Sequence, residues 1–130
     1  MPRNIARLLA LVWMGLIYYL SGRPAFDIEQ LFFAQDKVAH AVTFGILGAL
    51  FLASMQPTPE GYRLRQLWMA VVLTALYGVV DEWHQAFVPG RTPDAWDVVA
   101  DTVGAVVAVA LMYRLARPSA PGNSRKWGLH

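Results

Sequence analysis

Four long apolar stretches divide the sequence, and this pattern restricts the fold more than any other feature. They cover residues 5–20, 38–55, 67–87 and 94–113. Each is close to the roughly 20 residues that a helix needs to cross the hydrocarbon core of a bilayer. None shows the apolar–polar alternation typical of strands, and lipid accommodates only helices or closed barrels. The pattern therefore predicts an all-α fold, a polytopic membrane protein with a bundle of four transmembrane helices.

The composition supports a membrane location. Apolar residues make up 56% of the chain and charged residues 15%, against roughly 45–50% and about 25% in soluble domains. A soluble domain of 130 residues has too little interior to bury so much apolar surface. Cysteine is absent, which excludes thiol chemistry and disulfides. Basic and aromatic residues are not interleaved in the way that nucleic-acid binding requires, so we expect no nucleic-acid partner.

Proline, glycine and capping residues set the expected limits of the helices. We predict helices at about 5–21, 37–55, 65–87 and 93–116, with Thr92 as the N-cap of the last and a tight turn at Val88-Pro89-Gly90-Arg91. Residues 27–33 combine a capping box with apolar residues on one side, which predicts a short helix in the membrane interface between the first two spans. The segment 118–130 is rich in Pro, Ser, Gly and basic residues. We expect it to be a disordered basic tail behind a single transmembrane domain, 1–117.

The basic residues predict how the chain crosses the membrane. With the N-terminus in the cytoplasm, eight of the 11 Lys and Arg residues are cytoplasmic, and only Arg23, Lys37 and Arg91 are outside. The positive-inside rule favours this arrangement, with both termini cytoplasmic. Of the nine acidic residues, Glu60 alone is then inside.

Small residues recur every fourth position on two of the predicted helices. They are Ala41, Gly45 and Ala49 on the second and Ala100, Gly104 and Ala108 on the fourth. Such stripes allow membrane helices to approach each other closely.

Polar side chains gather toward the outer ends of three predicted helices. Three pairs have spacings that place both members on one helix face: Asp36 with His40, Glu82 with Gln85, and Asp97 with Asp101. Several of these groups should lie below the lipid headgroups. Ionisable groups inside the membrane cost several kcal/mol unless they are paired or hydrated, so they indicate a functional site. Because adjacent helical residues diverge, we expect one of the neighbours Asp81 and Glu82 to face inward, and choose Glu82. The alternative is that the cluster only joins the helices, with Arg91 or Lys37 neutralising an acid.

The order and spacing of these residues resemble the VanZ-like family. The matching motifs are Asp36-Lys37-x-x-His40-x-x-x-Phe44-x-x-Leu47-Gly48, Asp81-Glu82-x-x-Gln85-x-Phe87-x-Pro89-Gly90-Arg91 and Asp97-x-x-x-Asp101-x-x-Gly104. They extend over residues 36–108, more than half of the chain. Asp101 is a departure, since the family commonly carries asparagine there. An ionised Asp101 adds a negative charge, whereas a protonated one can donate a hydrogen bond as the amide does.

The resemblance implies a protein of the bacterial cytoplasmic membrane. The founding relative of the family confers low-level resistance to the glycopeptide teicoplanin, and many relatives occur without a resistance cluster. The implied role is therefore glycopeptide resistance or cell-envelope lipid handling, with membrane lipid, a lipid-linked cell-wall precursor or a lipoglycopeptide as partner.

The residues leave three kinds of mechanism open. An enzyme acting on a lipid-linked phosphate could use Glu82, Asp97 and His40 for acid–base catalysis. A divalent cation, as a possible cofactor, could be held by Asp97, Asp101, Glu82 and His40. A binding protein without chemistry could hold a head group, with candidate residues Arg91, Gln85, His40, Glu82, Asp97 and Asp101. A structural or accessory subunit is the third alternative. For the enzyme alternative, no HExxH, nucleophile-elbow or P-loop motif identifies a reaction.

Overall fold

The computed structural model describes residues 1–24 and 34–117. In this part of the chain four helices follow one another, α1 (Arg3–Ser21), α2 (Gln35–Ala53), α3 (Leu64–Gln85) and α4 (Ala95–Ala116). All four are long and apolar enough to cross a membrane, which confirms the predicted all-α, four-span architecture. The predicted interfacial helix at 27–33 and the predicted disordered tail at 118–130 lie outside the described residues.

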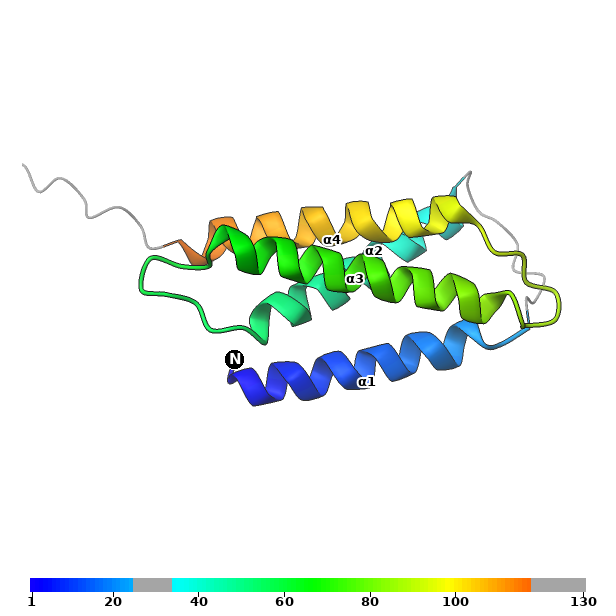
Figure 1. The fold of residues 1–130 in the computed structure, drawn as a ribbon, viewed down its shortest axis with the longest axis horizontal. Coiled ribbons are helices and arrows are strands. Elements are labelled where there is room, and N and C mark those ends of the chain that lie inside the picture. The colour runs from blue at the N-terminus through cyan, green and yellow to red at the C-terminus, as the bar shows by residue number, and fades with distance from the viewer. Residues whose placement is uncertain (25–33, 118–130) are drawn as a thin grey trace, which may run out of the picture.

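The four helices run alternately up and down (Figure 1). As a result, the ends of α1 and α3 and the beginnings of α2 and α4 lie at the same end of the bundle, on the right in Figure 1. We call this the polar end, because the predicted polar cluster lies there. The first residues of α1 and the last turn of α4 lie at the opposite end.

The small-residue stripes, which were expected to allow close approach of helices, form the contact between α2 and α4. A Cβ atom on Gly45 would lie 3.0 Å from the carbonyl oxygen of Gly104, and one on Gly104 would lie 1.9 Å from that of Ala41. The two backbones therefore touch with no side chain between them. This close approach brings polar residues of α2 and α4 within reach of each other at the polar end.

α1 is attached to the other helices by hydrogen bonds from aromatic side chains. Trp13 Nε1 donates to the carbonyl oxygen of Thr43 on α2 at 3.0 Å, and the Tyr77 hydroxyl on α3 donates to that of Met14 at 2.6 Å. Around these contacts Ala10, Ile17, Phe44 and Leu47 form a buried cluster. Many large apolar residues on the outward faces, such as Leu11, Leu76 and Leu115, are exposed, as expected for helices that face lipid chains.

The connection from α3 to α4 contains the predicted turn, but α4 begins later than predicted, at Ala95. The Arg91 amide donates to the carbonyl oxygen of Val88 at 3.1 Å, and Gly90 has a positive φ of 77°. The prediction of Thr92 as N-cap is wrong. Asp94 is the N-cap, because its carboxylate accepts a hydrogen bond from the Trp96 amide at 2.9 Å and so satisfies a free N–H of the first turn.

Candidate functional site

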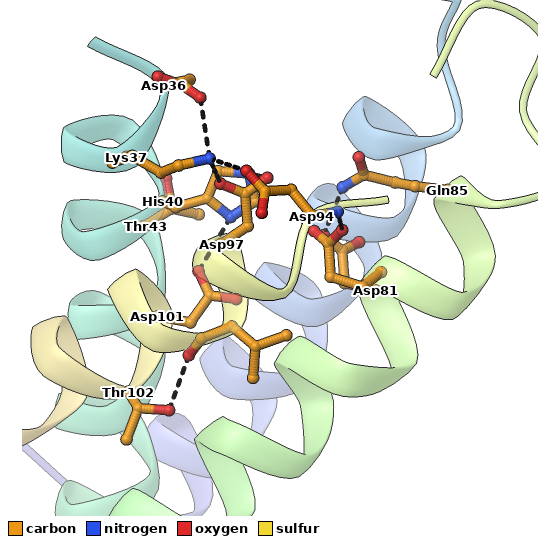
Figure 2. Close-up of polar contacts among 12 residues, drawn as sticks. Asp36, Lys37, His40, Thr43, Asp81, Gln85, Asp94, Asp97, Asp101 and Thr102 are labelled. Carbon is orange, nitrogen blue, oxygen red and sulfur yellow. Dashed lines mark hydrogen bonds and ion pairs between the residues drawn. The ribbon is translucent and has the colours of Figure 1, made fainter. Parts of the chain in front are cut away.

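Lys37 is the centre of an ion-pair network at the polar end. Its Nζ atom lies 2.5 Å from Asp94 Oδ2, 2.5 Å from Asp97 Oδ1 and 3.1 Å from Asp36 Oδ2. Figure 2 shows the lysine of α2 reaching across to acids at the start of α4. Lys37 therefore neutralises acids, as the alternative interpretation of the cluster foresaw, and it joins α2 to α4.

The Lys37 ammonium group changes the acidity of Asp94, which precedes the fourth span. Its hydrogen bond to Asp94 is the main reason why the pKa of this carboxyl is lowered, and the hydrogen bond from the Trp96 amide lowers the pKa further. Asp94 is thus ionised at neutral pH. As an anion it is a better acceptor for the N-terminal amides of α4.

His40 and Asp101 form a second pair, one turn deeper in the bundle. His40 Nδ1 lies 2.9 Å from Asp101 Oδ1, and Asp101 is completely buried. The other ring nitrogen, Nε2, lies 3.7 Å from Asp97 Oδ2, which is too far for a hydrogen bond. Figure 2 shows the imidazole above the Asp101 carboxylate. The imidazole therefore keeps one ring nitrogen for another partner.

Asp81 and Glu82 are both buried, and the prediction that only Glu82 faces inward is wrong. Their exposed fractions are 3% and 7%. Adjacent residues diverge by about 100° on a helix, but α3 is covered in both directions at this level. Asp81 faces a pocket that also involves α1 and α2, whereas Glu82 Oε2 accepts a hydrogen bond from the Asp94 amide at 2.8 Å.

Gln85 pairs with Asp81 rather than with Glu82. Its Nε2 atom donates to Asp81 Oδ2 at 3.0 Å, in the i, i+4 relationship that also links Asp36 to His40 and Asp97 to Asp101. The same spacing applied to residues 81 and 85 would have placed Asp81 inside the bundle from the sequence.

A pocket of about 180 Å³ opens among α1, α2 and α3 at the polar end. One part of its lining is apolar, from Ile17, Leu20, Ala39 and Phe44, and another is polar, from Ser21, His40, Thr43, Asp81, Gln85 and Arg91. The pocket thus brings together three residues predicted as ligand-binding, His40, Gln85 and Arg91. Glu82, Asp97 and Asp101 do not line it.

Arg91 reaches this pocket from the turn between α3 and α4. Its Nε atom donates to the carbonyl oxygen of Arg23 at 3.2 Å, which ties the turn to the end of α1. A guanidinium group has five N–H donors, so this one contact leaves it able to bind an anionic or carbonyl group.

Three side chains at the polar end are grouped closely enough to bind a metal ion. One ligand atom from each of His40, Asp81 and Glu82 lies within 4.8 Å of the other two. The group includes His40 and Glu82, two of the predicted metal ligands. Of the other two, Asp97 is held by Lys37 and Asp101 by His40.

A model of the VanZ/LLP1 family matches residues 5–117, which is most of the chain. The chain belongs to the VanZ/LLP1 family. No curated protein and no solved structure shows significant similarity to it. The match confirms the resemblance and extends it from residues 36–108 to all four helices, so that α1 is part of the VanZ/LLP1 unit.

Two contributions to the site of this VanZ/LLP1 protein were not predicted from the sequence. One is the inward position of Asp81. The other is α1, whose Ser21 lines the pocket. The Ser21 hydroxyl oxygen lies 3.4 Å from His84 Nδ1. The last turn of α1 carries no charged or amide side chain that would have distinguished it as part of a site.

Proposed function

We propose that this VanZ/LLP1 protein binds the polar head of a cell-envelope amphiphile in the pocket among α1, α2 and α3. Through this binding it contributes to glycopeptide resistance of the teicoplanin type or to the handling of envelope lipids. The observation that carries the proposal is the pocket itself, whose lining is apolar on one part and polar on another.

The lining suits a molecule with a polar head and an apolar tail. His40, Gln85 and Arg91 offer hydrogen-bonding groups, while Ile17, Leu20 and Phe44 offer apolar contacts. Specific ligand sites typically combine mostly apolar walls with a few convergent polar groups. The outward faces of the helices carry exposed apolar residues, along which an acyl or prenyl chain can continue into the bilayer.

Arg91 favours a head group that carries a phosphate or carboxylate. An arginine binds these groups through two parallel hydrogen bonds. Lipid-linked cell-wall precursors carry phosphate, and a lipoglycopeptide carries an acyl tail with polar groups. Both therefore remain partners of the same chemical class, an amphiphile with an acidic or carbonyl-bearing head.

The first experiment compares teicoplanin and vancomycin susceptibility in a sensitive Gram-positive host. The host carries wild-type protein, Ala39→Trp, which fills the pocket without removing a polar group, or Arg91→Ala. Glu60→Gln serves as the control, because Glu60 is exposed at the opposite end of the bundle. We expect wild type and Glu60→Gln to raise the inhibitory teicoplanin concentration several-fold, and both pocket variants to lose this protection at equal membrane abundance.

A direct binding measurement tests whether the protein binds an envelope lipid. Purified protein in detergent is titrated with farnesyl phosphate, a simple prenyl phosphate, by isothermal titration calorimetry. We expect saturable binding by wild type and Glu60→Gln and at least tenfold weaker binding by Ala39→Trp. The proposal would be contradicted if well-expressed wild type neither protected the host against teicoplanin nor bound farnesyl phosphate saturably.

A further inference from the structure

We propose that His40, Asp81 and Glu82 form a site for a divalent transition-metal ion, of the zinc or manganese class, beside the pocket at the polar end. The inference rests on the grouping of the three side chains, on two buried carboxylate oxygens without partners, and on the orientation of the imidazole.

The three side chains are already close to the spacing that a metal requires. Their ligand atoms all lie within 4.8 Å of one another. Ligands of a tetrahedral zinc ion lie about 2.1 Å from the metal, and therefore about 3.4 Å from each other. Side-chain movements of about 1 Å would close this difference without any change in the helices.

Each carboxylate has one oxygen in use and one without a partner. Asp81 Oδ2 accepts from Gln85 Nε2 and Glu82 Oε2 from the Asp94 amide. Within the described residues, Asp81 Oδ1 and Glu82 Oε1 are buried and have no hydrogen-bond partner. A buried acceptor without a partner costs about 1–3 kcal/mol, and more when it is charged. A bound cation removes this cost for both oxygens at once.

The imidazole presents its second nitrogen in the way that metal-binding histidines do. His40 Nδ1 lies 2.9 Å from Oδ1 of the buried Asp101 carboxyl group, and an ionised Asp101 accepts a hydrogen bond from Nδ1–H. This hydrogen bond selects the tautomer in which Nε2 carries a lone pair, as a carboxylate behind a metal-bound histidine typically does. Asp97 Oδ2, at 3.7 Å from Nε2, is close enough to this nitrogen to serve as an additional ligand.

The cations at the polar end do not neutralise these two acids. Lys37 pairs with Asp36, Asp94 and Asp97. Among residues 1–24 and 34–117, no lysine or arginine forms an ion pair with Asp81 or Glu82. Two adjacent buried carboxylates facing one imidazole leave an excess of negative charge that a divalent ion would balance.

The ligand set decides the class of the metal. An imidazole nitrogen suits zinc, iron or copper, whereas carboxylates suit manganese, magnesium and calcium. A mixed set of one nitrogen and two carboxylates therefore favours zinc or manganese over calcium. Three protein ligands also leave a coordination position open. His40 and Asp81 line the pocket, so an acidic head group could take this position, a step that rests on the proposed function.

The test measures metal binding by the full-length protein purified in detergent, without any lipid ligand. Zn²⁺ and Mn²⁺ are titrated separately, with bound metal measured by mass spectrometry and Mn²⁺ also by electron paramagnetic resonance. The variants are His40→Gln, Asp81→Asn and Glu82→Gln. Asp36→Asn is the matched control, because this acid lies at the same end but its side chain is 50% exposed.

We expect wild type and Asp36→Asn to bind one ion per chain with equal affinity. Each variant of the three ligands should bind at least about tenfold more weakly, and Asp101→Leu, which removes only the support of the imidazole, about 10–100-fold more weakly. Thermal melting without metal shows which variants are folded. If a ligand variant does not fold, the melting temperature of wild type with and without Zn²⁺ decides, and we expect the ion to raise it and a chelator to reverse the rise.

Two results would overturn the metal site. One is wild-type protein that binds neither ion and whose melting temperature neither ion changes. The other is a set of folded ligand variants that bind the ions as tightly as Asp36→Asn. Because these measurements need no lipid or antibiotic, the metal site can fail while Ala39→Trp still abolishes teicoplanin protection or prenyl phosphate binding, and the reverse also holds.

Discussion

A Cβ atom on Gly104 would lie 1.9 Å from the carbonyl oxygen of Ala41, so the backbones of α4 and α2 are in direct contact at this point. Gly104 lies about one helical turn below Asp101, and Ala41 directly follows His40. The separation of the two helices here therefore sets the distances across which Lys37 meets Asp97 and His40 meets Asp101. A glycine, which has no side chain, therefore determines the geometry of the polar end.

Gly104→Ala should destabilise the protein and disturb the polar end. The added methyl group has no room, so α2 and α4 must separate. We expect a loss of about 1–3 kcal/mol in the free energy of unfolding, measured by denaturant titration in mixed micelles. Gly15→Ala is the control, because a Cβ atom there meets nothing within 4 Å. Equal stability of the two variants would contradict the close packing of α2 and α4.

Lys37→Met should destabilise the protein through the acid that it leaves behind. Asp97 is 8% exposed and would lose the ammonium group that lies 2.5 Å from it. A hydrogen bond that involves a charged group, here the ammonium group, contributes about 1.5–3 kcal/mol. The double variant Lys37→Met/Asp97→Asn should lose less than the sum of the two single variants, because the amide leaves no unpaired charge. Strict additivity in this cycle would show that the two residues are not coupled.

The stability of the polar end should fall at acidic pH through protonation of Asp94. The pKa of Asp94 is lowered from 3.8 in the folded protein, chiefly by the Lys37 hydrogen bond. A lowered folded-state pKa means that this contribution is fully present above about pH 4 and is lost as the pH falls through the folded-state value. Melting temperatures of wild type and Asp94→Asn, measured from pH 7 to pH 2, should therefore converge at the acidic end. A constant difference across this range would exclude the ion pair as the cause.

The cysteine-free sequence allows a direct test of the predicted orientation. Thr92 lies at the polar end and Glu60 at the opposite end, and both are exposed. With cytoplasmic termini, a membrane-impermeant maleimide should label Thr92→Cys in intact spheroplasts and label Glu60→Cys only after the membrane is opened. Labelling in the opposite order would place the polar end in the cytoplasm and would reverse the topology that the basic residues predict.

The main parts of the fold follow from local patterns in the sequence. Runs of about 20 apolar residues can satisfy their backbone polar groups inside lipid only as helices, so the four spans were predictable one by one. The stripes around Gly45 and Gly104 predicted a close contact, because only small residues permit it. That the two stripes pack against each other was shown only by the structure. The ends of the helices depend on individual side-chain contacts. The cap of α4 is Asp94 rather than Thr92, because the Asp94 carboxylate is the group that reaches the Trp96 amide.

The sequence by itself therefore determined the four membrane spans, the gathering of acids and bases at one end, and the i, i+4 pairs that share a helix face. Only the tertiary structure decided which acid pairs with which base. The helical spacing predicts the face of the helix on which a side chain lies, but it does not predict which residue of another helix packs against that face. Asp81 shows this most clearly. Its neighbour Glu82 faces α4, yet Asp81 is buried as well, because α1 and α2 cover the other side of α3. The grouping of His40 with Asp81 and Glu82 thus arises from the packing of α2 against α3.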